Sequence, residues 1–549
     1  MYSVYSLKFF RFIFLFFLTF LIFISQDSWA ETPFTPANTP AINPITIPNT
    51  LPINYRIDYL QLRIPDQTNS LGLLGLHAQV TPFKNTLPYF YSGLGGYGAV
   101  RGNNSGFFAL GLESGIQYPF AYSWVLDSGL FLGTGGGHGL SSSIGDGSFL
   151  ESHLGLDYNF NYFLLGLAFS HWQFFDGELN NLNDNQILLN LTIPTDFSYW
   201  PGWASFQNNL FKNNFLNNNY QFSKNYFSIT SSFYFPHFFN SQIKNISGEK
   251  LTSSIGLVGF EIGHYFKPTE PYFIFLTFNG AVSGNKNGYA EALGGLGAEY
   301  DLYQNSPFYL LSKISLGSGG GGDIDTGGGL IIKPELGLEY KPLDQLGIAL
   351  TGAYLFSPGS SYQVWSLGLN LNYYFDLGYL GSLENTLFKK TPDYFDFNHF
   401  RIRLGNQLYI HPQHEDLNNS NNLNINLLDL KLDFFCNKFI YLTGQTAFAY
   451  TGNAAGYFSG LIGPGIQSAS YHHTYIYAEL LAGAAGGAGL DIGTGKMLEP
   501  LVGLGYQLTP AWSIYSSFGE TLSPNNNLRT KTIDLGFAYG FSALSAQNN

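Results

Sequence analysis

Few residues of this chain combine the types and spacing that catalysis or metal binding requires. Ser170 and His171 are direct neighbours, and neighbouring side chains of a strand point to opposite faces, so they do not form a nucleophile–base pair. His472 and His473 are adjacent without a third ligand, which makes a poor zinc site. His138 has no histidine counterpart elsewhere in the repeats described below. We therefore expect no catalytic residue, no metal site, no cofactor and no enzymatic activity.

Two acidic residues in a Gly-rich segment suggest a second kind of chemistry. Asp323 and Asp325 lie in the stretch GGGGDIDTGGG, which is similar to calcium-binding Gly–Asp loops. Such loops occur in nonapeptide repeats, and the sequence has none, so solvated loop carboxylates are the simpler interpretation. No Gly-Lys-Ser/Thr follows a Gly-rich segment, which excludes a phosphate-binding loop.

The composition indicates which elements must position any site. The chain has 549 residues, of which 11% are charged and 17% aromatic, including 51 Phe and 38 Tyr. Soluble domains carry roughly 25% charged residues, and disordered chains lack aromatics. Cys436 is the single cysteine, which excludes a disulfide scaffold. A chain of this kind is expected to face an apolar medium with every second residue.

The N-terminus has the features of a secretory signal peptide for the Sec pathway, over residues 1–30. Lys8 and Arg11 precede the apolar run Phe12–Ile24, and Ser28 and Ala30 supply the small residues of a cleavage site. An uncleaved anchor is the alternative. Cleavage leaves 22 basic and 36 acidic residues, a net charge of 22 − 36 = −14, which argues against nucleic acid as a partner. Residues 31–52 form a Pro-rich lead.

The rest of the chain alternates with the period of a strand. In Thr532–Phe541 and Tyr362–Phe375, every second residue is large and apolar and the others are small or polar. Segments of this length, separated by Gly, Asn and Pro, predict an all-β transmembrane antiparallel up-and-down barrel. A soluble β-sandwich is the alternative, but it does not account for the aromatic residues at strand ends. These are Tyr118, Phe120, Tyr122, Tyr158, Phe160 and Tyr162.

The last predicted strand resembles the C-terminal assembly signal of bacterial outer-membrane proteins, in which alternating apolar residues end in an aromatic. The matching residues are Ile533, Leu535, Phe537, Tyr539 and Phe541. The chain departs from the pattern in the tail 542–549, which follows the aromatic residue. The resemblance implies the outer membrane of a bacterial cell, with the barrel-assembly machinery, membrane lipid and lipopolysaccharide as partners.

Three landmarks recur three times in the same order, which predicts a triplicated unit. The first is Gly-Asn-x-x-Gly, with its glycines at Gly102, Gly106, Gly284, Gly288, Gly452 and Gly456. The second is a Gly-rich segment at Leu132–Gly139, Leu316–Asp323 and Ala482–Gly489, and the third is a strand at Leu154–Tyr158, Leu336–Tyr340 and Val502–Tyr506. The glycines are expected to supply positive φ in loops outside the cell.

Each copy divides into eight strands. We place the repeats at residues 53–197, 226–376 and 399–541, with linkers at 198–225 and 377–398. The third copy has strands near 399–411, 423–435, 439–451, 456–468, 474–486, 496–508, 512–521 and 531–541. Short connections alternate with longer ones along the chain, as in outer-membrane barrels.

The strands can close into barrels in two ways: as three tandem eight-stranded barrels, or as one closed 24-stranded barrel. Inward positions of the last strand are small, and the few charges of the third copy fall on the inward face, which favours three narrow barrels. These charges are Arg401, Arg403, Asp429, Lys431, Asp433, Glu499 and Asp534.

The unit resembles the small eight-stranded outer-membrane barrels of the OmpA, OmpX and OmpW kind. That resemblance implies a structural, adhesion or surface ligand-binding role, with the external ligand unknown. A porin or transport channel is the alternative for the single large barrel, and an enzyme at the barrel rim is the third hypothesis.

Overall fold

The computed structural model describes 24 β-strands, which agrees with the predicted all-β antiparallel fold of three groups of eight. The described residues are 48–64, 69–103, 105–137, 147–175, 183–203, 220–268, 270–304, 306–380, 394–413, 423–452, 454–487, 490, 492–524 and 528–547. The predicted signal peptide and residues 31–47 of the Pro-rich lead lie outside these ranges. Within them, no helix is long and apolar enough to cross a membrane.

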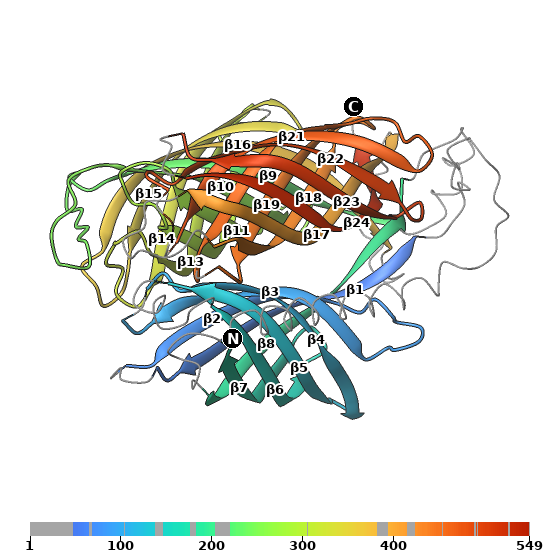
Figure 1. Ribbon diagram of the computed structural model, residues 1–549, viewed down its shortest axis with the longest axis horizontal. Helices are drawn as coiled ribbons and strands as arrows, with labels where there is room; N and C mark the ends of the chain where they lie inside the picture. Colours follow the sequence, from blue (N-terminus) through green and yellow to red (C-terminus); the bar gives the residue numbers. More distant parts are fainter. Residues whose placement is uncertain are drawn as a thin grey trace.

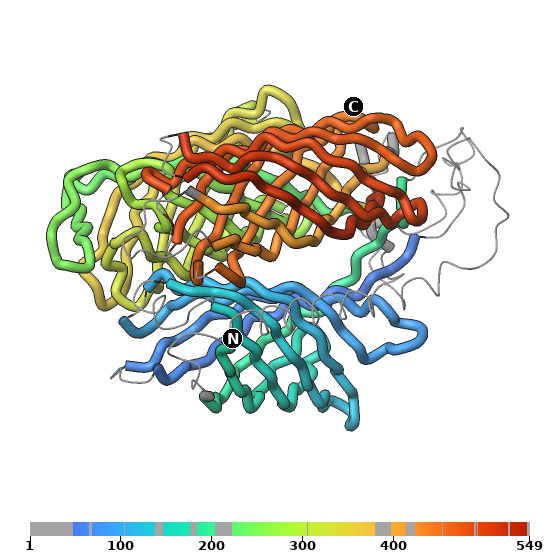
Figure 2. Tube along the Cα trace, in the orientation of Figure 1, coloured from blue at the N-terminus to red at the C-terminus, as the bar shows by residue number. Residues whose placement is uncertain are grey.

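The strands fall into three units of eight along the chain (Figures 1 and 2). The first unit contains β1 (Asn49–Leu62), β2 (Leu71–Val80), β3 (Phe90–Arg101), β4 (Phe108–Ala121), β5 (Trp124–Gly136), β6 (Ser148–Asn159), β7 (Leu164–Phe174) and β8 (Asn183–Pro201). The second unit contains β9 (Tyr220–Phe235), β10 (Ile255–Tyr265), β11 (Tyr272–Ala281), β12 (Ala290–Asp301), β13 (Phe308–Gly320), β14 (Leu330–Leu343), β15 (Leu346–Phe356) and β16 (Gln363–Leu380). The third unit contains β17 (Tyr394–Gln413), β18 (Ile425–Phe435), β19 (Ile440–Ala449), β20 (Phe458–Gln467), β21 (Thr474–Gly486), β22 (Lys496–Gln507), β23 (Trp512–Leu522) and β24 (Arg529–Gln547).

Strand pairing returns each unit to its own first strand. In the second unit, β9 pairs with β16 and closes an eight-stranded barrel. In the first unit, β1 pairs with β8 from Asn49↔Tyr199 to Tyr59↔Leu189. In the third, β17 pairs with β24 from Tyr394↔Gln547 onward. The alternative of one ring through all 24 strands is therefore wrong, because the second unit is closed by itself.

The first and third units are also joined to each other, by one short ladder. Only Phe541↔Pro201 and Ser542↔Trp200 pair between β24 and β8. Through this contact the sixteen strands of the two units form one continuous hydrogen-bonded sheet. Two residue pairs are few compared with the ladders inside each unit.

The ends of two predicted segments differ from the structure. The last strand was expected to stop at Phe541, with a tail at 542–549, but β24 continues to Gln547. It does so because β17 begins at Tyr394, before the predicted start at 399, and offers a partner for the extra residues. The linkers are shorter than expected for the same reason, since β8 and β9 extend to Pro201 and Tyr220, into the range 198–225.

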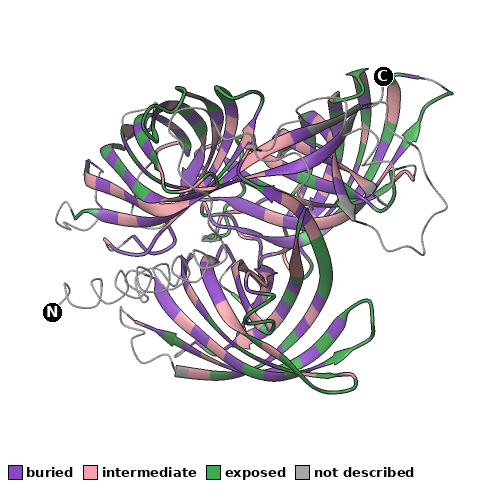
Figure 3. Ribbon diagram, turned by 90° about the vertical axis from the view of Figure 1, so that its right-hand side faces the viewer, coloured by how far each residue is buried: buried purple, intermediate pink, exposed green. Residues whose placement is uncertain are grey.

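Side chains alternate between a buried inward face and an exposed outward face along the strands (Figure 3). In β18, for example, Lys431 is fully buried, whereas the next residue, Leu432, is 44% exposed. The period of two places charged side chains inside and apolar side chains outside in a single strand.

The chain begins and ends each unit at one end of its barrel, which we call the linker end. The opposite end, which carries the Gly-Asn-x-x-Gly connections, is the loop end.

A disulfide placed across β1 and β8 tests the closure of the first unit. Tyr55 and Ile193 are direct partners in this ladder, and both side chains point outward. In a Cys436→Ser background, we expect Tyr55→Cys with Ile193→Cys to crosslink on oxidation, because paired strand residues lie within disulfide range. The matched control joins Tyr55→Cys to Leu189→Cys, which is displaced by four residues, about 13 Å along the strand. Equal crosslinking of both pairs on non-reducing gels, or of neither pair, would contradict the ladder.

Candidate functional site

All seven inward charges predicted in the third unit lie inside that barrel. Arg401 and Arg403 both bind Asp433: the Arg401 Nε donates to Asp433 Oδ2 at 2.6 Å, and the Arg403 Nη2 donates to Asp433 Oδ1 at 2.7 Å. Lys431 donates to Asp534 at 3.0 Å and lies 3.8 Å from Asp429. These groups come from β17, β18 and β24, and the Lys431–Asp534 pair joins the two strands on either side of β17.

The seventh predicted charge and one missed residue complete this network. Glu499 accepts hydrogen bonds from Gln407 at 2.9 Å and from Thr521 at 2.7 Å. Glu479 is equally buried, and it accepts from Arg403 at 2.5 Å and from Tyr441 at 2.6 Å. The sequence signal for Glu479 was present, because it alternates with the outward Ile476 and Leu480 of β21.

The first unit has its own buried network, formed by residues outside the predicted set of inward charges. Arg56 donates to Asp58 at 2.7 Å and also forms an ion pair with Asp127. On the other side of Asp127, His153 lies 3.2 Å from Glu151. The alternation that found the third network applies to NYRIDYLQL in β1 as well, where Arg56 and Asp58 fall on the inward face.

In the second unit, two lysines and two glutamates form the centre of the network. The Lys313 Nζ lies 3.0 Å from Glu261 and 2.8 Å from Glu335, and Lys333 lies 3.2 Å from Glu335. Hydroxyl and amide groups surround a polar cavity of about 20 Å³ beside these charges. That volume holds about one or two water molecules, and it does not amount to a channel.

Apolar clusters close each barrel toward the loop end. The first unit places Tyr97, Phe131, Phe149 and Trp172 together, with ring centroids 4.5–5.8 Å apart among the contacting pairs. The second and third units carry equivalent clusters of buried aromatic and aliphatic residues. The interior of each unit is thus filled by ion pairs and by a cluster of apolar side chains, as expected for an eight-stranded ring.

The second glycine of each repeated loop motif lies at a contact between two units. All six have positive φ, as expected from the turns. In addition, the second glycine of each motif packs against the last residue of the fifth strand in another unit. A Cβ on Gly136 would lie 2.5 Å from the Gly456 nitrogen, one on Gly320 2.5 Å from the Gly106 nitrogen, and one on Gly486 2.0 Å from the Gly288 nitrogen.

These three contacts form a closed cycle. The loop of the first unit packs on the second unit, the loop of the second on the third, and the loop of the third on the first. Strand contacts follow the same order: β3 with β13, β11 with β21, and β19 with β5. Figure 3 shows the three units grouped around a common centre. The second glycine of each motif therefore has a place between units in addition to the predicted positive φ, and the location of these loops outside the cell stays a prediction.

Hydrogen bonds support this cycle at equivalent positions. Ser318 of the second unit donates to the Ala99 carbonyl of the first at 2.7 Å, and Thr134 of the first unit donates to the Ala449 carbonyl of the third. In the third unit, Ala484 has the equivalent place and has no hydroxyl. A Cβ on Gly280 of the second unit would lie 2.7 Å from the Ala484 Cβ.

The predicted assembly signal lies on the outward face of β24. Ile533 and Leu535 are exposed, and Phe541 packs on Phe400 with ring centroids 5.3 Å apart. Phe541 also contacts Phe197 of the first unit at 5.8 Å. Whether these residues act in assembly stays a prediction.

The candidate chemical residues do not form a reactive site. Ser170 is buried and donates to Glu151 at 2.6 Å, whereas His171 points outward and contacts Asn185 at 2.9 Å. His472 and His473 lie exposed in the β20–β21 turn with positive φ. His138 lies outside the described residues.

Asp323 and Asp325 of the Gly-rich segment are both bound by nearby protein groups. Asp323 pairs with Lys286 at 3.3 Å, and Asp325 accepts from the Gly327 nitrogen at 2.9 Å. In the described part of the chain, no group of three or more His, Cys, Asp or Glu residues is placed to hold a metal ion.

Removing one arginine from the third network is expected to destabilise the protein strongly. Arg403→Met leaves Asp433 and Glu479 buried with one partner fewer, which costs about 3–5 kcal/mol in comparable buried pairs. Arg529→Met is the matched control, because Arg529 forms an exposed pair with Glu520 and exposed pairs contribute little. Denaturant unfolding followed by tryptophan fluorescence measures both, and equal midpoints would contradict a stabilising network.

Adding a side chain at the glycine interface is expected to separate two units. Gly486→Val places atoms against the Gly288 backbone, which has no flexible end to move, and overpacking of this kind costs about 1–3 kcal/mol. Gly460→Val is the control, because a Cβ there meets no atom within 4 Å. The midpoint of thermal unfolding should fall for the first variant only. A fall of the same size in both would place the effect in the strands instead.

Comparison with known proteins gives similar structures but no family. No family model and no curated protein matches the sequence. A variant of the ferric enterobactin receptor from Pseudomonas aeruginosa is 9% identical, over 89% of this chain and 81% of that one, with a TM-score of 0.27. OccK5 from Pseudomonas aeruginosa is 9% identical over 90% and 98%, at 0.21, and a bacterial polysaccharide outer membrane secretin is 7% identical over 89% and 97%, at 0.19. TM-scores this low do not establish a common fold.

Proposed function

We propose that the chain is an integral outer-membrane protein of three tandem eight-stranded barrels, with a structural or surface ligand-binding role and no open channel. The observation that carries this proposal is the distribution of polarity across the barrel walls. Charged side chains are buried inside each unit, while leucine, isoleucine and aromatic side chains are exposed on the outside. Soluble proteins rarely expose contiguous apolar surface of this kind, whereas a bilayer covers it.

Exposed apolar side chains occur on the outer walls of all three units. In the first unit they include Leu154, Leu165, Leu167, Phe169 and Ile187. In the second they include Leu296, Ile314, Leu336, Leu350 and Leu369, and in the third Ile476, Leu480, Val502, Leu504 and Phe518. No unit has a polar outer wall along these strands, so each would contact lipid directly.

Aromatic residues at the linker end support the same proposal. Tyr118, Phe120 and Tyr122 lie at the β4–β5 turn, and Tyr158 and Tyr162 lie at the β6–β7 turn; all are exposed. Tyr303 and Tyr471 are similarly exposed at linker-end turns of the second and third units. Amphipathic rings at one level suit the boundary between hydrocarbon and headgroups. Membrane lipid and lipopolysaccharide would then be the immediate partners, and the barrel-assembly machinery would insert the chain.

The filled interiors favour a structural or binding role over the porin alternative. That alternative needed one wide ring, and the second unit closes by itself. Inside each unit, ion pairs and an apolar cluster occupy the width through which a solute would pass. The protein therefore acts through contacts made by its outer surfaces and not by passing a solute through its interior. An enzyme at the rim is not favoured, because Ser170 and His171 point to opposite faces.

Planar bilayers test the absence of a channel. We expect the purified full-length chain to insert without stable, stepwise conductance, because ion pairs and apolar side chains fill the described barrel interiors. Insertion is checked separately, by flotation with liposomes and by the shift in gel mobility on heating. Large, steady steps from inserted protein would contradict the closed interiors. Failure to float, with the folded form intact, would contradict the membrane location itself.

A further inference from the structure

The outer wall of the second unit has a groove across its strands. Its floor is a row of residues paired directly across β12 to β15, in the order Ala298↔Ser312, Ser312↔Leu336 and Leu336↔Gly352. All four point outward, and all but Leu336 are small. The cavity over this row has a volume of about 630 Å³, which is within the range of small-molecule sites.

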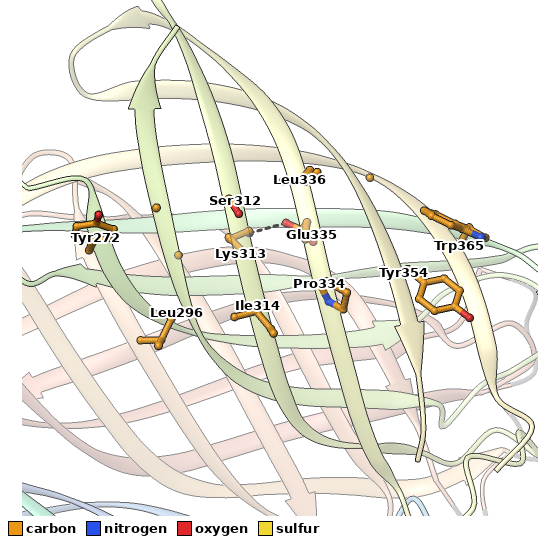
Figure 4. A pocket seen from close by; sticks show the side chains of 13 residues that line it. Tyr272, Leu296, Ser312, Lys313, Ile314, Pro334, Glu335, Leu336, Tyr354 and Trp365 are labelled. Atoms are coloured by element: carbon orange, nitrogen blue, oxygen red, sulfur yellow. Dashed lines mark ion pairs between the residues drawn. The ribbon is translucent and has the colours of Figure 1, made fainter. Parts of the chain in front are cut away.

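Larger side chains form the borders of the groove. On the loop side, the next row contains Leu296, Ile314 and Pro334, followed by Tyr354 and Trp365. On the linker side, the next row contains Tyr300, Leu310, Leu338 and Leu350, all of them exposed. Figure 4 shows Tyr272 and Trp365 at opposite ends, with the other labelled side chains between them.

The groove is narrow and long. Its floor follows the hydrogen-bonding direction from β12 to β15, which corresponds to about 14 Å for three strand spacings. Its width is one row of side chains. Such a shape accepts a single extended chain rather than a compact molecule. Charge does not select the occupant, because Lys313 and Glu335 pair with each other and point inward.

The same row is filled in the other units, although the pairing is identical. In the first unit it reads Ile116, Ser128, Leu154 and Phe169. In the third it reads Ile466, Ala478, Val502 and Phe518. The positions of Ala298 and Gly352 are thus occupied by isoleucine and phenylalanine in both. The groove is therefore a property of two positions in one unit, and not of the barrel design.

We propose that this groove binds one acyl chain of a phospholipid, which rests on the proposed membrane location. The walls are hydrocarbon, and the medium that reaches them in a bilayer is hydrocarbon as well. The end of the groove at β11 and β12 lies toward the linker end of the barrel, and it provides the place for the ester and headgroup. There, the Tyr300 hydroxyl donates to the Tyr272 hydroxyl at 3.0 Å, and both rings are exposed. Tyrosines at this level are suited to the headgroup boundary.

The linker end also decides between two lipid sources. The chain enters and leaves each unit there, on the side of the short turns, which in outer-membrane barrels faces the periplasm. Phospholipid supplies that leaflet, whereas lipopolysaccharide supplies the outer one. A lipid anchored at Tyr272 and Tyr300 would extend one chain along the floor row toward Gly352, past Ser312.

Exchange of residues between units tests the proposal in the full-length protein. Ala298→Ile with Gly352→Phe copies the first and third units, and a Cβ on Gly352 meets no atom within 4 Å, so the barrel accommodates the change. The proteins are delipidated in detergent, checked for heat-modifiable migration, and titrated with phosphatidylethanolamine under native mass spectrometry. We expect the unaltered protein to retain one lipid at a concentration about tenfold below that needed by the filled variant.

The reverse exchange is the matched gain-of-function variant. Ile466→Ala with Phe518→Gly opens the same row in the third unit and should add a second retained lipid. If the double variant Ala298→Ile with Gly352→Phe unfolds, Ala298→Ile alone should still weaken retention of phosphatidylethanolamine. Equal retention by unaltered and filled proteins would overturn the groove as the site. Retention of lipopolysaccharide in preference to phosphatidylethanolamine would overturn the occupant. Because retention is measured in detergent, it is independent of liposome flotation, which tests the membrane location.

Discussion

The width of an eight-stranded ring is the constraint on which the rest of this structure depends. Such a ring has room inside for side chains and for little else. Charges on the inward face therefore meet one another across the barrel, and each must find a partner. Arg403 meets Asp433 and Glu479, and Lys313 meets Glu261 and Glu335. The same narrowness excludes a wide aqueous path, so the outer wall and the loop end carry whatever contacts the protein makes.

A second constraint follows from placing three such rings side by side. Two barrel walls approach most closely where neither has a side chain, and glycine is the residue that permits this. The close contacts at Gly136, Gly320 and Gly486 are the result. Positive φ at the Gly-Asn-x-x-Gly motif is only half of the reason for its glycines, because the second glycine of each motif also meets the backbone of a neighbouring unit. One short motif thus shapes a turn and an interface together.

Much of the architecture could be predicted from the sequence, because period-two alternation and near-constant repeat spacing are local signals. The strand expected at 474–486 coincides with β21, and the seven inward charges of the third unit are all buried. The contacts between units could not be predicted in this way. They join residues such as Thr134 and Ala449, which are 315 positions apart, and alternation within a strand does not show which strands of different units meet. The groove was missed for another reason: alternation shows that Ala298 and Gly352 face outward, but only strand register shows that they belong to one row.

The linkage of three similar units in one chain has a consequence for what each unit can become. In an assembly of identical subunits, every substitution appears three times, and a change that suits one position must be tolerated at all of them. Here the interface glycines are present in every copy, whereas the small residues at 298 and 352 occur in one. Because the three units are parts of one chain, each can change its sequence independently. The glycines at the contacts between units are the same in every copy, whereas the residues on the outer wall can differ from unit to unit.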